Sequence, residues 1–125
     1  MDTREKIIPL DAAANIAREQ KMQALAGRFD PLLAEHARRI AELSDSQPLL
    51  VFVLDYDGAI LPAAARAELV AALKSVRYVS IADTSALEEL SAGFSIVRED
   101  EHDVERQKQL LEHIRRREHS TRSPQ

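Results

Sequence analysis

A glycine, an arginine, an aspartate and a histidine follow the first apolar run of the sequence in a pattern that suits a bound anion. Gly27 ends this run and permits a tight turn, and a helical pattern follows, so free backbone amides would face the loop. Arg28 and His36 add positive charge or donors, while Asp30 has the position of a helix cap with Pro31 behind it. Spacing alone favours a half-buried helix residue over a ligand for His36. The segment predicts a phosphate site formed mainly by backbone amides.

Four short apolar runs predict the strands that would position these residues, namely Met22–Ala26, Leu49–Leu54, Tyr78–Ile81 and Phe94–Val97. The second run is continuous rather than alternating, which is typical of a strand covered on both faces. Strands that alternate with helices indicate a parallel sheet. We expect a three-layer, Rossmann-like α/β domain with a mostly parallel sheet of four to five strands.

Helical spacing with a start signal occurs five times. The residues that start these helices are Asp11, Asp30 with Pro31, Pro62, Thr84 or Ser85, and Asp103. Ser85 and Glu88 have the spacing of a capping box. The predicted helix ends lie near residues 20, 43, 73 and 117, and the last helix is a highly charged addition to the fold. We expect one domain over residues 1–119 and a disordered tail over 120–125.

Composition excludes several classes of function. The net charge of -4 and the aromatic content of 4% argue against binding of nucleic acid by bulk charge or by base stacking. The chain has no cysteine, so thiolate metal sites and disulfides are excluded. The four histidines lack the spacing of a metal-binding pair. No secretory signal or bilayer-spanning stretch is visible, so we expect a cytoplasmic protein that binds no membrane.

Two stretches carry a resemblance to a known family. Gly27-Arg28-Phe29-Asp30, followed by Leu33-Ala34-Glu35-His36, resembles the signature of the nucleotidylyltransferase superfamily in its cytidylyltransferase branch. In that signature, Gly-x-Phe-Asp precedes His-x-Gly-His. The strand end Val53–Asp57 and the stretch Arg66–Val79 are similar to the family's second strand and to its Arg-led helix with the third strand. The resemblance covers roughly residues 6–97.

The resemblance implies transfer of a nucleotidyl group from CTP or ATP to a small phosphorylated acceptor, with Mg²⁺ accompanying the nucleotide. Homodimers are common in the family, so a homodimer is expected. By resemblance, His36 would be catalytic. The residues that would bind nucleotide phosphates are Gly27, Arg28, Phe29, Asp30 and His36, and those that would flank the site are Asp55, Asp57 and Arg66.

Departures from the family's signature bear on activity. Leu33 replaces the first signature histidine and cannot donate to a phosphate. Glu35 replaces the signature glycine and places a negative charge beside a polyanion. The mobile phosphate-binding loop is shortened, and the charged helix 103–119 stands in place of the family's Ser/Thr-rich motif. Since such enzymes act by positioning and neutralising phosphates, weak or lost transfer is expected.

The stretch Val51–Gly58 also resembles the first motif of haloacid-dehalogenase-type phosphatases, in which an apolar strand delivers Asp-x-Asp-Gly. The resemblance would make Asp55 the nucleophile and metal ligand, and Asp57 the general acid. Thr84 fits the family's Ser/Thr position, but Lys108 is the only later lysine and no acidic pair follows it. An acidic loop at a strand end is favoured over a phosphatase.

Three hypotheses therefore remain at the level of sequence. The first is a nucleotidylyltransferase with residual activity. The second, of equal standing, is a non-catalytic module that binds a nucleotide or another protein. The third is the phosphatase.

Overall fold

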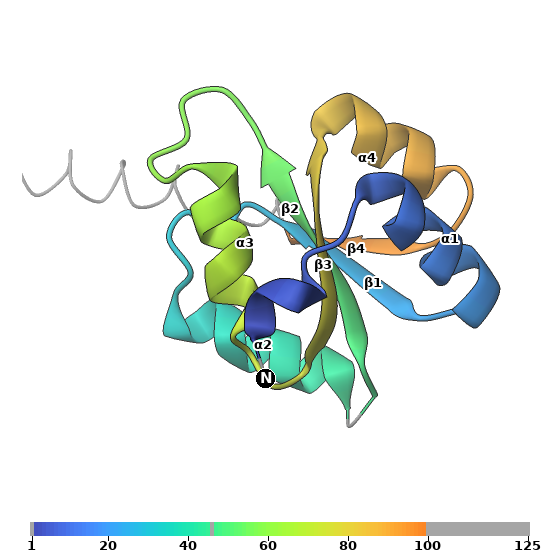
Figure 1. The fold of residues 1–125 in the computed structure, drawn as a ribbon, viewed down its shortest axis with the longest axis horizontal. Helices are drawn as coiled ribbons and strands as arrows, with labels where there is room; N and C mark the ends of the chain where they lie inside the picture. Colours follow the sequence, from blue (N-terminus) through green and yellow to red (C-terminus); the bar gives the residue numbers. More distant parts are fainter. Residues whose placement is uncertain (1, 46, 100–125) are drawn as a thin grey trace, which may run out of the picture.

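The structure, a computed structural model, describes residues 2–45 and 47–99. A four-stranded sheet lies at its centre, and every neighbouring pair of strands is parallel, as the alternation of strands and helices predicts (Figure 1). The strands are β1 (Gln23–Gly27), β2 (Leu49–Asp55), β3 (Val76–Asp83) and β4 (Ile96–Arg98). Their order in the sheet is β3-β2-β1-β4, so β1 and β2 occupy the middle.

Helices cover both faces of this sheet and make the three layers that we expected. The helices are α1 (Leu10–Gln20), α2 (Ala34–Ser44), α3 (Ala63–Ala71) and α4 (Thr84–Ser91), and a 3-10 helix, η1 (Thr3–Lys6), precedes them. In Figure 1, α1 and α4 lie on one side of the sheet and α2 and α3 on the other. The predicted Rossmann-like α/β fold is confirmed.

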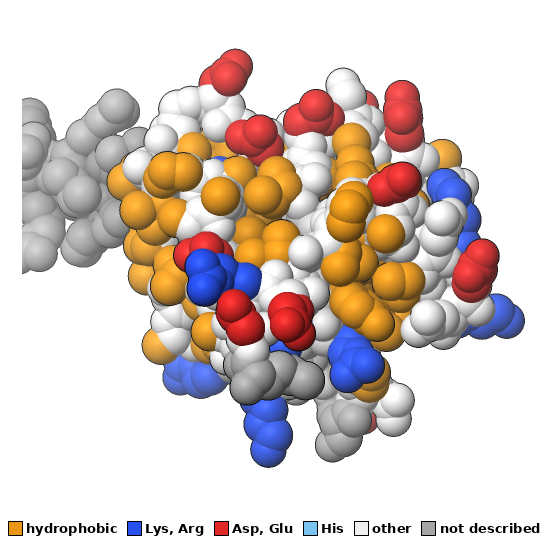
Figure 2. All heavy atoms as spheres, in the orientation of Figure 1, with side chains coloured by type: hydrophobic (Ala, Val, Ile, Leu, Met, Phe, Trp, Pro, Cys, Tyr) orange, Lys and Arg blue, Asp and Glu red, His pale blue; other side chains and the backbone are white. Residues whose placement is uncertain are grey.

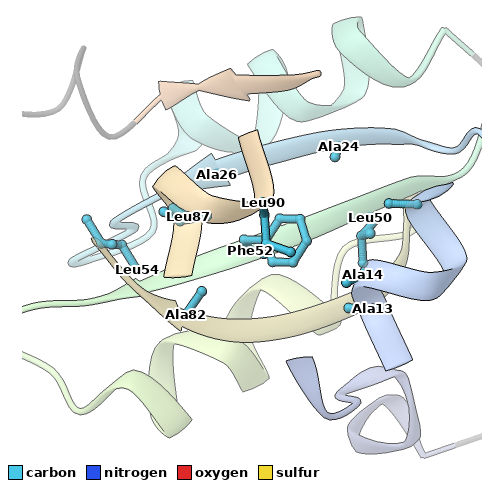
Figure 3. Close-up of a cluster of buried hydrophobic side chains, with 11 residues drawn as sticks. Ala13, Ala14, Ala24, Ala26, Leu50, Phe52, Leu54, Ala82, Leu87 and Leu90 are labelled. Atoms are coloured by element: carbon cyan, nitrogen blue, oxygen red, sulfur yellow. The ribbon is translucent and has the colours of Figure 1, made fainter. Parts of the chain in front are cut away.

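The continuous apolar run of β2 is explained by its burial on both faces. Leu50 and Phe52 belong to the cluster under α1 and α4, whereas Val51 and Val53 belong to the cluster under α2 and α3. Figure 3 shows Phe52 at the centre of the first cluster, beside Leu90 of α4. Because successive side chains of a strand point to opposite faces, every residue of this run had to be apolar.

The segment that leads into α1 covers the open edge of β3. Ile7 forms a parallel bridge with Val79. The amide of Ile8 donates to the carbonyl of Val79 at 2.8 Å, and the hydroxyl of Ser80 donates to the carbonyl of Ile8 at 2.9 Å. Pairing of this kind satisfies backbone groups that an exposed edge strand would leave open. It also fixes η1 beside the sheet.

Two predicted helix starts are wrong in detail. Helix α1 begins at Leu10, one residue before Asp11, whose carboxylate accepts from the amide of Ala12 instead of capping from outside. Helix α2 begins at Ala34, so Asp30 and Pro31 lie in the preceding loop. A helix starts elsewhere when the side chain expected to cap it bonds to another part of the chain. Asp30 is an example, because its carboxylate accepts from amides of the β2–α3 loop.

The third and fourth helices begin close to their signals. Helix α3 starts at Ala63 with Pro62 just before it, and α4 starts at Thr84 as one of the two expected positions. The cap of α4 is Asp83, whose carboxylate accepts from the amide of Ala86 at 2.8 Å. The prediction that Ser85 and Glu88 cap this helix is therefore wrong, because Asp83 caps it.

The predicted charged helix from Asp103 and the tail over 120–125 lie outside the described residues. Within the described part of the chain, no helix combines the length and apolar character needed to cross a bilayer.

Candidate functional site

Loops at the carboxyl ends of β1, β2 and β3 meet at one edge of the sheet, where ligands bind in parallel α/β folds. Gly27 pairs in register with Val53, and Asp55 pairs with Asp83. The loops that follow β1 and β2 therefore lie next to one another. Most of the predicted site residues lie in these loops or end the strands before them, as Gly27 and Asp55 do. His36 and Arg66 lie in the helices that follow each loop.

Arg66 is fully buried in α3 and connects both loops. Its Nε donates to the carbonyl of Leu61 at 2.9 Å, and its Nη1 donates to the carbonyls of Arg28 at 2.8 Å and Leu54 at 2.6 Å. Its Nη2 is buried and has no hydrogen-bond partner among the described residues. The guanidinium of Arg66 thus holds the end of β2 and the two loops together, with backbone oxygens around it.

Asp30 also ties the loop after β1 to the loop after β2. Its carboxylate accepts from the amides of Ile60 and Leu61, each at 2.8 Å, and from the hydroxyl of Tyr56. The expected role of Asp30 as cap of α2 is wrong, because the β2–α3 loop supplies these donors instead. Burial, the largest single influence, raises the pKa of Asp30. Its three hydrogen bonds and the charge of Arg66 together outweigh that influence and lower the pKa.

Two guanidinium groups lie close to the ring of Tyr56. The guanidinium carbon of Arg28 is 4.3 Å from the centre of the Tyr56 ring, and that of Arg66 is 5.2 Å away. Both distances suit attraction between a cation and the face of an aromatic ring. Burial and the hydrogen bond to Asp30 raise the pKa of Tyr56 to about 12. Tyr56 stays a neutral donor to the Asp30 carboxylate at neutral pH.

Gly27 serves a packing role that the sequence pattern did not reveal. A Cβ atom at this position would lie 2.5 Å from the ring of Phe29, which is buried beneath the loop. Phe29 itself has a φ of 50°, an uncommon backbone conformation for a residue with a side chain. The loop after β1 therefore folds its aromatic side chain back onto the glycine, where we expected an open turn around a phosphate.

His36 is buried at the start of α2, as its spacing favoured, and one ring nitrogen is engaged there. Its Nδ1 accepts from the amide of Leu33 at 3.0 Å, which satisfies one of the free amides at the start of the helix. In neutral His36 the proton is then on Nε2. The ring of Phe29 packs edge-on against it, with centroids 5.5 Å apart. His36 is a helix-capping side chain in this arrangement.

The acidic residues after β2 are exposed at the sheet edge. Asp55 and Asp57 are both exposed, and Thr84 lies at the end of the neighbouring strand, where the phosphatase motif would need it. Lys108, the lysine that this reading requires, lies outside the described residues. Over residues 2–45 and 47–99, no group of three or more side chains of His, Cys, Asp or Glu is placed to hold a metal ion.

The sequence pattern missed the partners that join the predicted residues. Tyr56 lies within the motif Val51–Gly58, but the motif gave it no role. The contacts of Leu54, Ile60 and Leu61 are made by backbone atoms, which residue types do not reveal. The available hint was an Arg in the mainly apolar helix Ala63–Ala71, whose other charged residue is Glu68, because a buried arginine needs acceptors close by.

We predict that Arg66→Met destabilises the fold by about 2–4 kcal/mol, because three backbone carbonyls lose their donor while the side-chain volume is largely kept. Urea unfolding measures the difference. Arg38→Met on the exposed face of α2 is the matched control, and it should change stability by less than about 0.5 kcal/mol. Equal stability of the two variants would contradict a structural role for Arg66.

Tyr56 offers a direct titration. The chain has two tyrosines, so Tyr78→Phe leaves Tyr56 as the one phenol, and its tyrosinate absorbance should appear near the value of about 12. Because the pKa of Tyr56 is raised on folding, its contribution to stability is full below pH 10.0 and is lost as the pH rises toward about 12. In the Asp30→Asn background, the pKa should fall. If the phenol of Tyr56 titrates at its ordinary pKa of 10.0 while Asp30 is intact, the hydrogen bond between Tyr56 and Asp30 does not form.

No family model matches the sequence, and a search of curated proteins found no match either. The resemblance to nucleotidylyltransferases therefore rests on the stretches Gly27–Asp30, Leu33–His36, Val53–Asp57 and Arg66–Val79 of this chain.

Proposed function

We propose that this chain is a non-catalytic relative of the nucleotidylyltransferases, a binding module that uses the carboxyl edge of its sheet to contact another protein. The fold places its loops where such enzymes hold a nucleotide. In this chain, the groups that those loops present to a ligand decide whether it can be a nucleotide.

One observation carries the proposal: groups that would bind phosphate are engaged within the chain. Arg66 donates to three backbone carbonyls, and Nδ1 of His36 accepts an amide proton. Asp30 accepts the amides of Ile60 and Leu61, which would otherwise face the loop as anion-binding donors. A triphosphate would have to break these bonds before it gained any of its own, which opposes tight binding.

The side chains that face solvent at this edge also suit a protein better than a nucleotide. Leu33 is 48% exposed and Ile60 is 76% exposed, and Asp30 ties their two loops together. Exposed large apolar side chains on neighbouring loops favour contact with an apolar surface. Glu35, Asp55 and Asp57, all exposed, add negative charge around them.

The partner implied by this edge is a protein surface that combines apolar and basic side chains. Its apolar side chains would cover Leu33 and Ile60, and its Lys or Arg side chains would lie opposite Asp55 and Asp57. The expected homodimer fits this description if the carboxyl edge of one copy packs against a basic surface of the other, because a symmetric contact would place like charges opposite one another. Residual nucleotidyl transfer and phosphatase activity remain the alternatives, and both need the same edge to accept a phosphate.

Pyrophosphate release tests the proposal most simply. With CTP or ATP, Mg²⁺ and a mixture of phosphorylated sugars and polyols, we expect release no faster than in the buffer control, because several charge-stabilising donors are engaged or replaced. Loss of one such donor alone commonly slows an enzyme about a hundredfold.

The double variant Leu33→His with Glu35→Gly serves as a comparison, since it restores both signature positions. Release by the wild type above the buffer control, abolished by His36→Ala, would overturn the proposal. Calorimetry with CTP and ATP gives a second readout. Heat of binding at micromolar nucleotide, lost on Asp30→Asn, would argue for a working nucleotide site.

A further inference from the structure

A basic cavity opens at the opposite edge of the sheet, where the strands begin. Its volume is about 380 Å³, which lies within the range of small-molecule sites. The residues that line it come from η1, the end of α2, the turn before β2 and the turn into β3. They are Lys6, Ser44, Gln47, Pro48, Lys74, Ser75, Val76 and Arg77. None of these lining residues is acidic.

Lys6 is held at this cavity by the backbone around it. The pairing of Ile7 and Ile8 with Val79 fixes η1 beside β3. The ammonium of Lys6 donates to the carbonyl of Leu73 at 3.2 Å, which places the charge next to the turn that enters β3. An ammonium has three donors, so this one bond leaves capacity for a ligand.

Lys74 and Arg77 flank the same turn. The amide of Val76 donates to the carbonyl of Leu73 at 3.2 Å, and the amide of Leu49 donates to the carbonyl of Ser75 at 3.2 Å, so the turn is fixed against β2. Lys74 and Arg77 are exposed at its two ends. Three cationic side chains from two distant segments therefore converge on one cavity.

The distribution of charge over the molecule makes this edge distinctive. Figure 2 shows Asp and Glu side chains along the upper edge of the view, over the β2–α3 loop and α4. Lys and Arg side chains project from the lower edge, where η1 and the turn into β3 lie in Figure 1, and Asp and Glu side chains lie just above them. Asp2 and Glu5 belong to the η1 segment, but neither lines the cavity. The chain has a net charge of -4, and the lining of this cavity, with three cationic and no acidic side chains, departs from that balance in the direction that suits an anion.

We propose that this cavity binds a compact polyanion, a small molecule that carries a pyrophosphate or two neighbouring phosphate groups. Arg77 supplies a planar guanidinium suited to two phosphate oxygens, and the two ammonium groups supply point charges on either side. The hydroxyl of Ser75 and the side-chain amide of Gln47 are polar groups of the lining that suit the remaining oxygens. The site is separate from the carboxyl edge, so it does not depend on the function proposed above.

Calorimetric titration with inorganic pyrophosphate, in buffer of low ionic strength, tests the proposal. We expect saturable binding by the wild type and a loss of affinity of at least about tenfold in the double variant Lys74→Gln with Arg77→Gln. The double variant Arg18→Gln with Arg38→Gln removes the same charge from exposed positions elsewhere and should bind like the wild type.

Amide chemical shifts locate the bound ion independently of affinity. Pyrophosphate should shift the amides of residues 74–77 and leave those of residues 28–30 and 55–58 unchanged. The proposal is overturned if the wild type shows no saturable binding, if both double variants weaken it equally, or if the shifts fall at the carboxyl edge instead.

Discussion

The guanidinium of Arg66 is the group on which the carboxyl edge depends. A buried cation is costly to remove from water, by several kcal/mol even after the protein adjusts, unless acceptors surround it. Here the acceptors are the carbonyls of Leu54 at the end of β2 and of Arg28 and Leu61, which belong to the two loops that would otherwise frame a ligand site. Asp30 and Tyr56 complete the arrangement, because a carboxylate near the guanidinium compensates its charge. The same contacts that keep the cation buried close the loops against each other.

This constraint changes what the fold can do. In parallel α/β domains, free amides after β1 and basic side chains nearby bind phosphates at the carboxyl edge. In this chain the amides of Ile60 and Leu61 go to Asp30, and the amide of Leu33 goes to His36. Exposed carboxylates and apolar side chains remain at that edge, whereas the cations gather where the strands begin. We therefore propose that anions bind at the edge where the strands begin and not at the carboxyl edge.

The layers of the fold were predictable, but the contacts inside the site were not. The continuous run in β2 and the alternation of strands and helices follow from burial on both faces, a signal that each segment carries by itself. The sequence around Asp30 and around Gly27 is compatible with several roles for each residue. Their actual roles depend on Tyr56, on two amides of a distant loop and on the ring of Phe29. Contacts between loops leave no periodic pattern, so reasoning from sequence assigned Asp30 to the nearest helix.

Hydrogen exchange at Nε of Arg66, followed by nitrogen NMR and assigned with Arg66→Lys, tests the central claim most directly. Because this N–H donates to the carbonyl of Leu61 in a buried setting, the account predicts slow exchange in the free protein. It also predicts no change of the signal when CTP, ATP or pyrophosphate is added. Fast exchange in the free protein, with a signal that moves on addition of CTP, would show that the guanidinium serves a nucleotide and would contradict the account.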